Sequence, residues 1–340
     1  MIQLKKISVK SLVVLLAVLV LNGCGNSQKK GGDVTVEIEV VRIERELAQM
    51  DKYNPEVVSS DLLRTYPEFM ALYTNRIINI GDTTEPYYST NLNAFVTDRV
   101  NFELAERVEA VYADFSVYHE ELSNALGRYQ QYFPEKELPV VYTFISGINQ
   151  SIVTGDNILG ISLDKYLGQN ERLYERVYPP IPNYQLQLMA KEYLVSDAIR
   201  GWVGSDILYQ PIKDNFLSRI LHEARVIYIS EKMLPEDCDT LLWGFSAAQM
   251  KFCIESEAEM WKYLIEQKLL FSTDNFRISK FVDPGPFTKD FTRESPARAA
   301  VWIGYKIIEQ YMARESDITL SELAAENDFQ RLLNEARYNP

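Results

Sequence analysis

Apolar residues along this chain follow two different periods. Over residues 55–133 they recur at spacings of three and four, which predicts amphipathic α-helices. Within this region one continuous stripe predicts a helix with Leu92, Val96, Val100, Leu104, Val108 and Val111 on one face. Helical patterning returns from residue 184 to the C-terminus. Together the two regions predict a mostly helical protein.

Three segments have the texture of β-strands instead. Residues 34–41 alternate apolar with polar side chains, which predicts a strand with one buried face. Residues 140–145 and 157–163 are rich in β-branched and aromatic side chains, and the Gly-containing break between them predicts a hairpin. The expected fold class is therefore α+β, predominantly α-helical with a small mid-chain sheet. No long linker interrupts residues 34–340, so we expect one domain there.

The helical segment 184–199 carries two carboxylates near its apolar face. Asp197 stands where the apolar stripe should continue, and Glu192 lies one step off the stripe. Burying an unpaired carboxylate is costly. Asp197 therefore either lines a polar pocket or groove, or makes a structural hydrogen bond to a neighbouring segment.

The helical segment 216–230 carries His222 and Glu223, which either take part in acid–base chemistry or are structural or solvent-facing. This pair begins like the His-Glu-x-x-His motif of zinc proteases, but Val226 stands at the position of the second histidine. The chain has only two histidines, and it lacks a Gly-x-Ser-x-Gly elbow, a Walker loop and a Gly-x-Gly-x-x-Gly motif. We expect no metal and no cofactor.

Aromatic residues offer a different kind of candidate site. Residues 247–270 predict a helix with Trp261 on its apolar side, and Trp302 lies in a later helical pattern. Such side chains either line a sugar- or peptide-binding cleft or fill the core.

The last long helix is expected to begin at Ser295-Pro296, with serine as the cap and proline in the first helical position. It leads through Arg298, a further candidate for binding. Gly304 in its interior weakens the helix, which predicts that another segment packs closely against it.

The N-terminus has the features of a lipoprotein signal. Three lysines precede an unbroken apolar run of about ten residues, half of what a membrane-spanning helix needs. The run ends in Leu-Asn-Gly-Cys24, which resembles the lipobox of bacterial lipoproteins. We therefore expect residues 1–23 to be a signal peptide, Cys24 to carry acyl chains, and residues 24–33 to form a flexible tether.

Charge excludes one class of partner. The formal net charge is −13, and it becomes about −16 once the three N-terminal lysines are removed. Nucleic acid repels so acidic a body, so we expect no nucleic-acid partner. Besides Cys24 only Cys238 and Cys253 remain, and they form either a disulfide or two buried free thiols.

Several short blocks of the sequence recur in one known family. They include Tyr66-Pro67-Glu68-Phe69, Tyr132-Phe133-Pro134, residues 142–147, 159–168, 260–266 and 269–272, Pro284-Gly285-Pro286-Phe287-Thr288 and Trp302-Ile303-Gly304-Tyr305. In this order, and with the N-terminal lipobox, they resemble the gliding motility lipoprotein GldB family of Bacteroidota over nearly all of residues 34–340. Ala297 and Tyr305 depart from the family pattern.

The resemblance implies an envelope lipoprotein needed for gliding or for related machinery. Its expected partners are the membrane, through the N-terminal lipid, and other envelope or motility proteins. The residues after Cys24 lack an adjacent Asp and an acidic run, so we expect a periplasm-facing anchor, in either the outer or the inner membrane.

The family is also distantly similar to predicted zinc-dependent proteases. Their motif would correspond to residues 189–195 of this chain, where Lys191 and Val195 replace the two histidines and only Glu192 remains. The resemblance thus implies a peptidase-like scaffold that has lost its metal.

Three hypotheses follow from these observations. The first is a non-enzymatic component that acts through protein contacts. The second is a hydrolase of unrecognised type that uses Glu192, Asp197, His222 or Glu223, in a pocket where at least two of them converge with shifted pKa values. The third is a glycan- or peptide-binding lipoprotein with an aromatic-lined groove.

Overall fold

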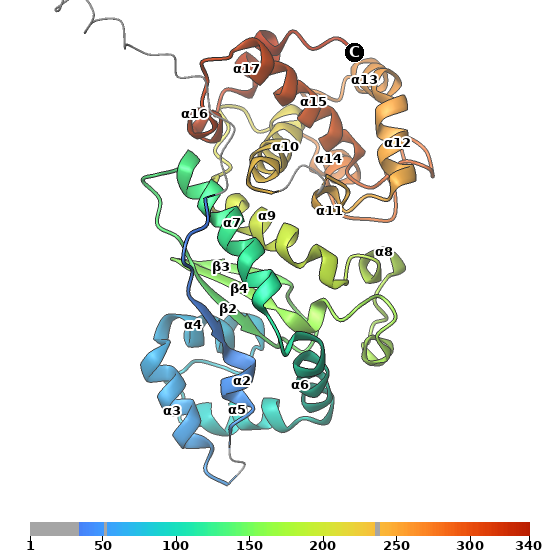
Figure 1. The fold of residues 1–340 in the computed structure, drawn as a ribbon. Helices are drawn as coiled ribbons and strands as arrows, with labels where there is room; N and C mark the ends of the chain where they lie inside the picture. Colours follow the sequence, from blue (N-terminus) through green and yellow to red (C-terminus); the bar gives the residue numbers. More distant parts are fainter. Residues whose placement is uncertain (1–33, 51–52, 235–238) are drawn as a thin grey trace, which may run out of the picture. The chain divides into compact units, whose positions relative to one another are not determined.

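A four-stranded mixed sheet lies between two groups of helices (Figure 1). Its strands are β1 (Val40–Arg42), β2 (Val140–Phe144), β3 (Ile152–Gly155) and β4 (Ile158–Ser162), in the order β1-β2-β4-β3. β1, β2 and β4 run parallel to one another, and β3 pairs antiparallel with β4. The expected α+β class, mainly helical with a small sheet, is confirmed.

The structure, a computed structural model, describes residues 34–50, 53–234 and 239–340, and Thr35–Pro340 form one compact unit. The helices before β2 are α2 (Ile43–Leu47), α3 (Pro55–Thr65), α4 (Pro67–Leu72), the π-helix η1 (Tyr73–Ile77), α5 (Tyr88–Thr97), α6 (Arg99–Tyr112) and α7 (Ser116–Tyr132). After β4 come the 3-10 turns η2 (Leu163–Lys165) and η3 (Arg172–Arg176), then α8 (Asn183–Leu186), the 3-10 turn η4 (Lys191–Tyr193), α9 (Leu194–Asp206) and α10 (Phe216–Met233). The remaining helices are α11 (Asp239–Trp243), α12 (Ala247–Glu255), α13 (Glu257–Glu266), α14 (Asn275–Val282), α15 (Ala299–Arg314), α16 (Leu320–Ala325) and α17 (Phe329–Ala336).

Side chains of the sheet alternate between two hydrophobic clusters. Val141 of β2 and Leu159 of β4 belong to a large cluster shared with α7, α9, α10 and α15. Tyr142 and Phe144 belong to a smaller cluster with α2 to α5, in which Phe69 of α4 stacks on Tyr142 with 4.2 Å between ring centroids. Because successive side chains of a strand point to opposite faces, this alternation covers the sheet with helices on both sides.

The predicted hairpin between residues 140–145 and 157–163 is wrong. These two strands, β2 and β4, pair in parallel over their full length. The hairpin joins β4 to β3, a short strand that the sequence pattern did not reveal. A buried apolar run locates a strand but does not say in which direction its neighbour runs, because parallel and antiparallel core strands carry the same residue types.

The first strand is shorter than predicted. The alternating pattern covers residues 34–41, but only Val40–Arg42 pair in the sheet, parallel to β2. Just ahead of β1, the Glu39 carbonyl accepts a hydrogen bond from the Val141 N–H at 2.9 Å.

Three predicted helices are interrupted. The stripe over residues 92–111 belongs to two helices, α5 and α6, because the Asp98 side chain accepts hydrogen bonds from the N–H groups of Val100 and Asn101 and caps α6. Residues 184–199 contain α8, the turn η4 and the start of α9. Residues 247–270 divide at Ser256 into α12 and α13.

The cysteines can be placed only in part. Cys253 of α12 is a buried free thiol, and burial raises its pKa to about 12. Cys238, its candidate partner, lies outside the described residues, as does Cys24.

The close packing predicted at Gly304 is confirmed. A Cβ atom at this position of α15 would lie 2.6 Å from the carbonyl oxygen of Ile220 in α10 and 3.1 Å from the Ala224 Cβ. The backbone of α10 cannot move as easily as the end of a flexible side chain, so the absence of a side chain at Gly304 determines how closely α10 and α15 approach.

Replacing Gly304 with alanine should therefore destabilise the protein by about 1–3 kcal/mol, because the two helices must move apart. Gly204 of α9 is the matched control, since a Cβ there would meet only the Val226 Cγ1 at 3.5 Å, an ordinary contact. Gly204→Ala should be neutral or stabilising by up to about 1 kcal/mol, because alanine favours a helix. Urea unfolding measures both, and equal effects would contradict the close-packing argument.

Candidate functional site

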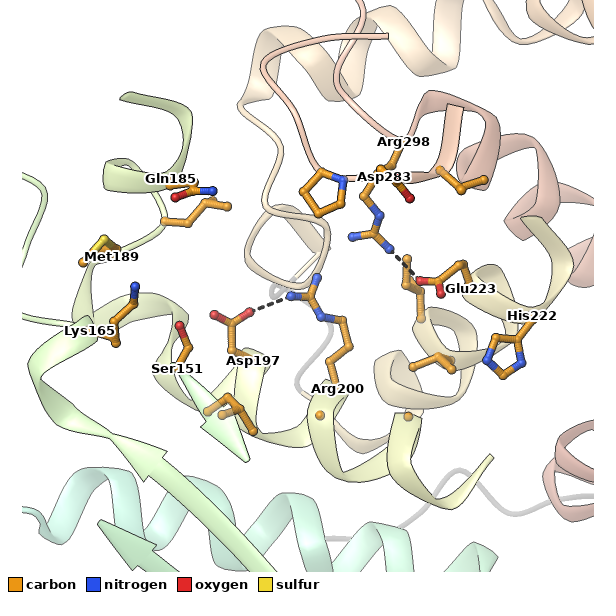
Figure 2. A pocket seen from close by; sticks show the side chains of 18 of the residues that line it. Ser151, Lys165, Gln185, Met189, Asp197, Arg200, His222, Glu223, Asp283 and Arg298 are labelled. Atoms are coloured by element: carbon orange, nitrogen blue, oxygen red, sulfur yellow. Dashed lines mark hydrogen bonds and ion pairs between the residues drawn. The ribbon is translucent and has the colours of Figure 1, made fainter. Parts of the chain in front are cut away.

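A cleft of about 920 Å³ opens at the C-terminal ends of the parallel strands β2 and β4 (Figure 2). Its walls come from the loop after β2 (residues 145–151), the turn η2 after β4, the helices α8, α9 and α10, and the segment 282–298. Crevices at the carboxyl ends of parallel strands are common ligand sites in open sheets.

Asp164, a fully buried residue of η2, fixes the loop after β2. Its carboxylate accepts hydrogen bonds from the backbone N–H groups of Ser146 at 3.1 Å and Ile148 at 2.6 Å, and from the Ser162 hydroxyl. Burial raises the pKa of Asp164, and these hydrogen bonds oppose the rise. The carboxylate thus joins the ends of β2 and β4 and holds Ile148 in a left-handed conformation (φ 65°).

The two residues that follow Asp164 reach the cleft. The Lys165 ammonium donates to the Ile148 carbonyl at 3.3 Å, and no carboxylate in the described part of the chain forms an ion pair with it. Burial lowers the pKa of Lys165. Tyr166 is almost fully buried, and its hydroxyl donates to Oδ2 of Asp197 at 3.0 Å. The block 163–168 therefore supplies the cleft with a cation, Lys165, and with the hydroxyl of Tyr166, which binds Asp197 on the opposite wall.

Asp197 lies in the first turn of α9, and both of its carboxylate oxygens are occupied. Oδ2 accepts from Tyr166, and Oδ1 accepts from Nη2 of Arg200 at 3.0 Å. Burial raises the pKa of Asp197, while Arg200 and the Tyr166 hydroxyl oppose the rise. The residue lines the cleft and is also tied to a neighbouring segment, so the two alternatives raised by the sequence apply together.

Arg298 enters the cleft from the segment before α15. The predicted helix start at Ser295-Pro296 is wrong, because α15 begins at Ala299 and Arg298 has a left-handed backbone with φ 61°. The Thr288 hydroxyl donates to the Pro296 carbonyl at 2.8 Å and accepts from the Ala299 N–H at 3.2 Å. A left-handed conformation costs free energy for a residue with a side chain, and these hydrogen bonds hold it in place.

The guanidinium of Arg298 lies near a carboxylate, that of Glu223, and near another cation, the guanidinium of Arg200. Its Nη2 donates to Oε2 of Glu223 at 3.3 Å. Burial and the nearby Arg200 guanidinium lower the pKa of Arg298 to about 10. Arg200 and Arg298, with Asp197 and Glu223 as their partners, form a chain of charges in the cleft (Figure 2).

His222 lies at the edge of the same cleft, with 4.9 Å between its ring centroid and that of Tyr209. Nη2 of the buried Arg225 lies 3.1 Å from its Nδ1, and since arginine can only donate, Nδ1 accepts. Burial, with Arg225 and Arg219, lowers the pKa of His222 to about 4. The imidazole is therefore neutral at pH 7, and one of its nitrogens is occupied.

The other candidates lie elsewhere. Glu192 is exposed in η4 and lines a second hollow of about 760 Å³ beside α7. Trp261 packs edge to face on Tyr338, with 5.1 Å between centroids. Trp302 is buried in the core, 5.3 Å from the ring of Trp243. In the described part of the chain, no tryptophan lines the cleft.

The residues compared with the zinc-protease motif do not share one helix turn. Lys191 and Glu192 belong to η4 and Val195 to α9, and all three line the second hollow, not the cleft. Across the described residues, no three His, Cys, Asp or Glu side chains are grouped so that they could hold a metal ion. The donor sets of both hollows therefore do not fit zinc.

The sequence named Asp197, His222, Glu223 and Arg298 as separate candidates, and the structure brings all four to one cleft. The sequence analysis missed Lys165 and Arg200. The signal for Arg200 was available, because it follows Asp197 by three residues, the helical spacing of an ion pair. Lys165 lies in one of the blocks on which the family resemblance rests, but nothing local shows that its ammonium faces a cleft.

Replacing His222 with glutamine should flatten the acid dependence of stability. Its pKa is about 4 in the folded protein against an ordinary value of 6.5, so the unfolded chain takes up the proton first as the pH falls. Between pH 6.5 and 4 the parent should lose up to about 3 kcal/mol of unfolding free energy that the variant keeps. Urea unfolding at pH 7.5 and 4.5 measures this, and equal losses in both proteins would contradict it.

Comparison with known proteins identifies the family to which the chain belongs. A family model described as gliding motility protein GldB matches residues 25–340. No curated protein and no solved structure matches the chain. None of the helices in the described ranges combines the length and the apolar character needed to cross a membrane. The match covers all of the described residues, and the chain therefore belongs to the GldB family of gliding motility lipoproteins.

Proposed function

We propose that this protein is a lipid-anchored, non-enzymatic component of the gliding motility machinery, or of related envelope machinery, and that it acts through protein contacts. In this proposal residues 1–23 are removed, Cys24 carries the lipid, and the body faces the periplasm on the tether 24–33. Family membership supports an envelope lipoprotein. The anchor itself lies outside the described residues.

One observation carries the non-enzymatic part of the proposal. The two carboxylates inside the cleft are bound to arginines, Asp197 to Arg200 and Glu223 to Arg298, and the third carboxylate that lines it, Asp283, is exposed at the rim. A general base must be free to accept a proton from its substrate. His222 is engaged by Arg225 through Nδ1, and a pKa near 4 makes it a weak base. The cleft is thus better suited to binding than to proton transfer.

A hydrolase is the second candidate, because one observation favours it. Asp197, His222 and Glu223 converge in one cleft, and burial shifts the pKa values of Asp197 and His222. Shifted pKa values often mark catalytic groups. Glu192, the fourth residue of that hypothesis, lines a different hollow.

Replacement of the cleft carboxylates by their amides separates the two candidates. Asp197→Asn and Glu223→Gln keep the side-chain shape but remove the proton-accepting group. In a gliding strain without its own family member, we expect both variants to restore surface gliding to at least half the parental speed, since contacts and not proton transfer are required. Cys24→Ala should abolish gliding, because the anchor is lost. Loss of gliding in a stable, normally exported Asp197→Asn protein would instead support the hydrolase if Arg200→Gln, which removes the same ion pair but no proton acceptor, still glides.

Elemental analysis tests the proposal that this scaffold has lost the zinc of the proteases to which its family is distantly similar. The full chain purified in detergent should contain zinc far below one equivalent by elemental analysis, and so should its Glu192→Ala variant, because Lys191 and Val195 cannot serve as zinc ligands. Stoichiometric zinc in the parent that disappears in the variant would contradict a metal-free scaffold and direct the work to peptidase assays.

A further inference from the structure

We propose that the cleft binds an acidic peptide segment of a partner protein, that Arg200 and Arg298 bind its carboxylate, and that Lys165 donates to the same segment from the other side of the cleft. This inference rests on the proposed function, a component that acts through protein contacts, and names the chemistry of the contact.

The three cations have unused hydrogen-bonding capacity. Among the residues that the structure describes, Lys165 donates to the Ile148 carbonyl alone, at 3.3 Å, although an ammonium has three donors. Arg298 contacts Glu223 through Nη2 alone, also at 3.3 Å, so within the described residues most of its five N–H donors have no protein acceptor. Arg200 binds Asp197 at 3.0 Å and the Leu242 carbonyl at 3.3 Å. Figure 2 shows Lys165 on one side of the cleft and the two arginines on the other.

The two arginines are incompletely neutralised. Among the described residues, Arg200 is hydrogen-bonded to one carboxylate, Asp197, and Arg298 to one, Glu223. The charge of Lys165, by contrast, is favoured by the buried Asp164 behind the wall of the cleft. Arg219 also lines it, but its guanidinium is bound to Asp214 through two hydrogen bonds of 2.9 Å. Asp283 is exposed at the rim. A further anion would complete the cluster, and charge-assisted hydrogen bonds to it are stronger than neutral ones.

The neighbouring arginines also destabilise each other. Arg200 contributes to lowering the pKa of Arg298, which means that the two positive charges interact unfavourably. A carboxylate bound between them would offset this repulsion. The planar guanidinium fork matches a carboxylate in a bidentate arrangement, which an ammonium cannot provide.

The rest of the lining favours a peptide over a small anion. Ile152, Leu188, Met189 and Val226 provide apolar surface, and the side-chain amides of Asn149 and Gln185 offer partners for a peptide backbone. The volume of about 920 Å³ is near the upper end for ligand pockets and far exceeds a single carboxylate. A neutral glycan would add no negative charge between the two arginines.

The backbone around Arg298 already has a fixed conformation without a bound partner. Its left-handed conformation is fixed by Thr288, which bonds to Pro296 and Ala299 on either side of it. Asp197 likewise holds Arg200 and is itself held by Tyr166. Binding groups that are already in place lose less entropy when the ligand binds.

The test compares two end-blocked, fluorescent pentapeptides that share apolar flanks and differ only in a central glutamate or glutamine. With the full chain in detergent, fluorescence anisotropy should show that the glutamate peptide binds at least tenfold more tightly. Lys165→Gln and Arg298→Gln should each weaken its binding about tenfold, and Arg298→Gln should also reduce the preference for glutamate. Arg298→Lys should fall between parent and Arg298→Gln, because it keeps the charge and loses the fork.

Lys251→Gln is the matched control, since Lys251 is an exposed lysine of α12 outside the cleft, and it should bind like the parent. Thermal melting checks the fold, and if Arg298→Gln does not fold, Lys165→Gln decides the question. Equal binding of the two peptides, binding of neither, or an equal loss in Lys251→Gln overturns the proposal. Inorganic phosphate that binds where neither peptide does also overturns it.

Failure of this inference can be told from failure of the proposed function. If the glutamate peptide binds as expected while cells carrying Lys165→Gln and Cys24→Ala both glide normally, the cleft chemistry stands and the role in motility fails. If neither peptide binds and Cys24→Ala still abolishes gliding, the motility role stands and the cleft inference fails.

Discussion

The buried carboxylate of Asp164 is the interaction on which the cleft depends. Burying a charge is costly unless hydrogen bonds compensate, and Asp164 collects them from both strand ends, through Ser146 and Ile148 after β2 and Ser162 in β4. One side chain thus fixes the loop after β2 and the turn η2 together. Lys165 and Tyr166 follow it directly in sequence, so their positions at the cleft are set by the same anchor.

The opposite wall is built by backbone constraints and not by a buried charge. α10 and α15 approach closely because Gly304 has no side chain to separate them. Ahead of α15, the Thr288 hydroxyl bonds on both sides of Arg298 and directs its side chain toward Glu223 of α10. The two walls meet through Asp197, which binds Tyr166 on one side and Arg200 on its own helix.

The sequence was sufficient for the helical regions, for the two central strands and for the close contact at Gly304, because each depends on local spacing or on the absence of a side chain. It was not sufficient for the direction of strand pairing, since β2 and β4 carry the same apolar texture that a hairpin would. Asp197 stood out because it interrupts an apolar stripe. Lys165 did not, because only the tertiary fold shows that its ammonium reaches the cleft. The left-handed turn at Arg298 was also hidden, since Ser-Pro is a common helix start.

The short strand β1 has a mechanical consequence for an anchored protein. Val40–Arg42 is where the chain coming from the N-terminus first joins the sheet, and it is held as an edge strand parallel to β2. If Cys24 carries a lipid, as proposed, tension applied through it would load the contacts of Thr35 and Val36 with α7 first and then this strand. The few backbone hydrogen bonds between β1 and β2 would resist it together if the pull ran along the strand, and one after another if the pull ran across it. The direction of pulling would therefore decide how much force the body withstands before β1 detaches.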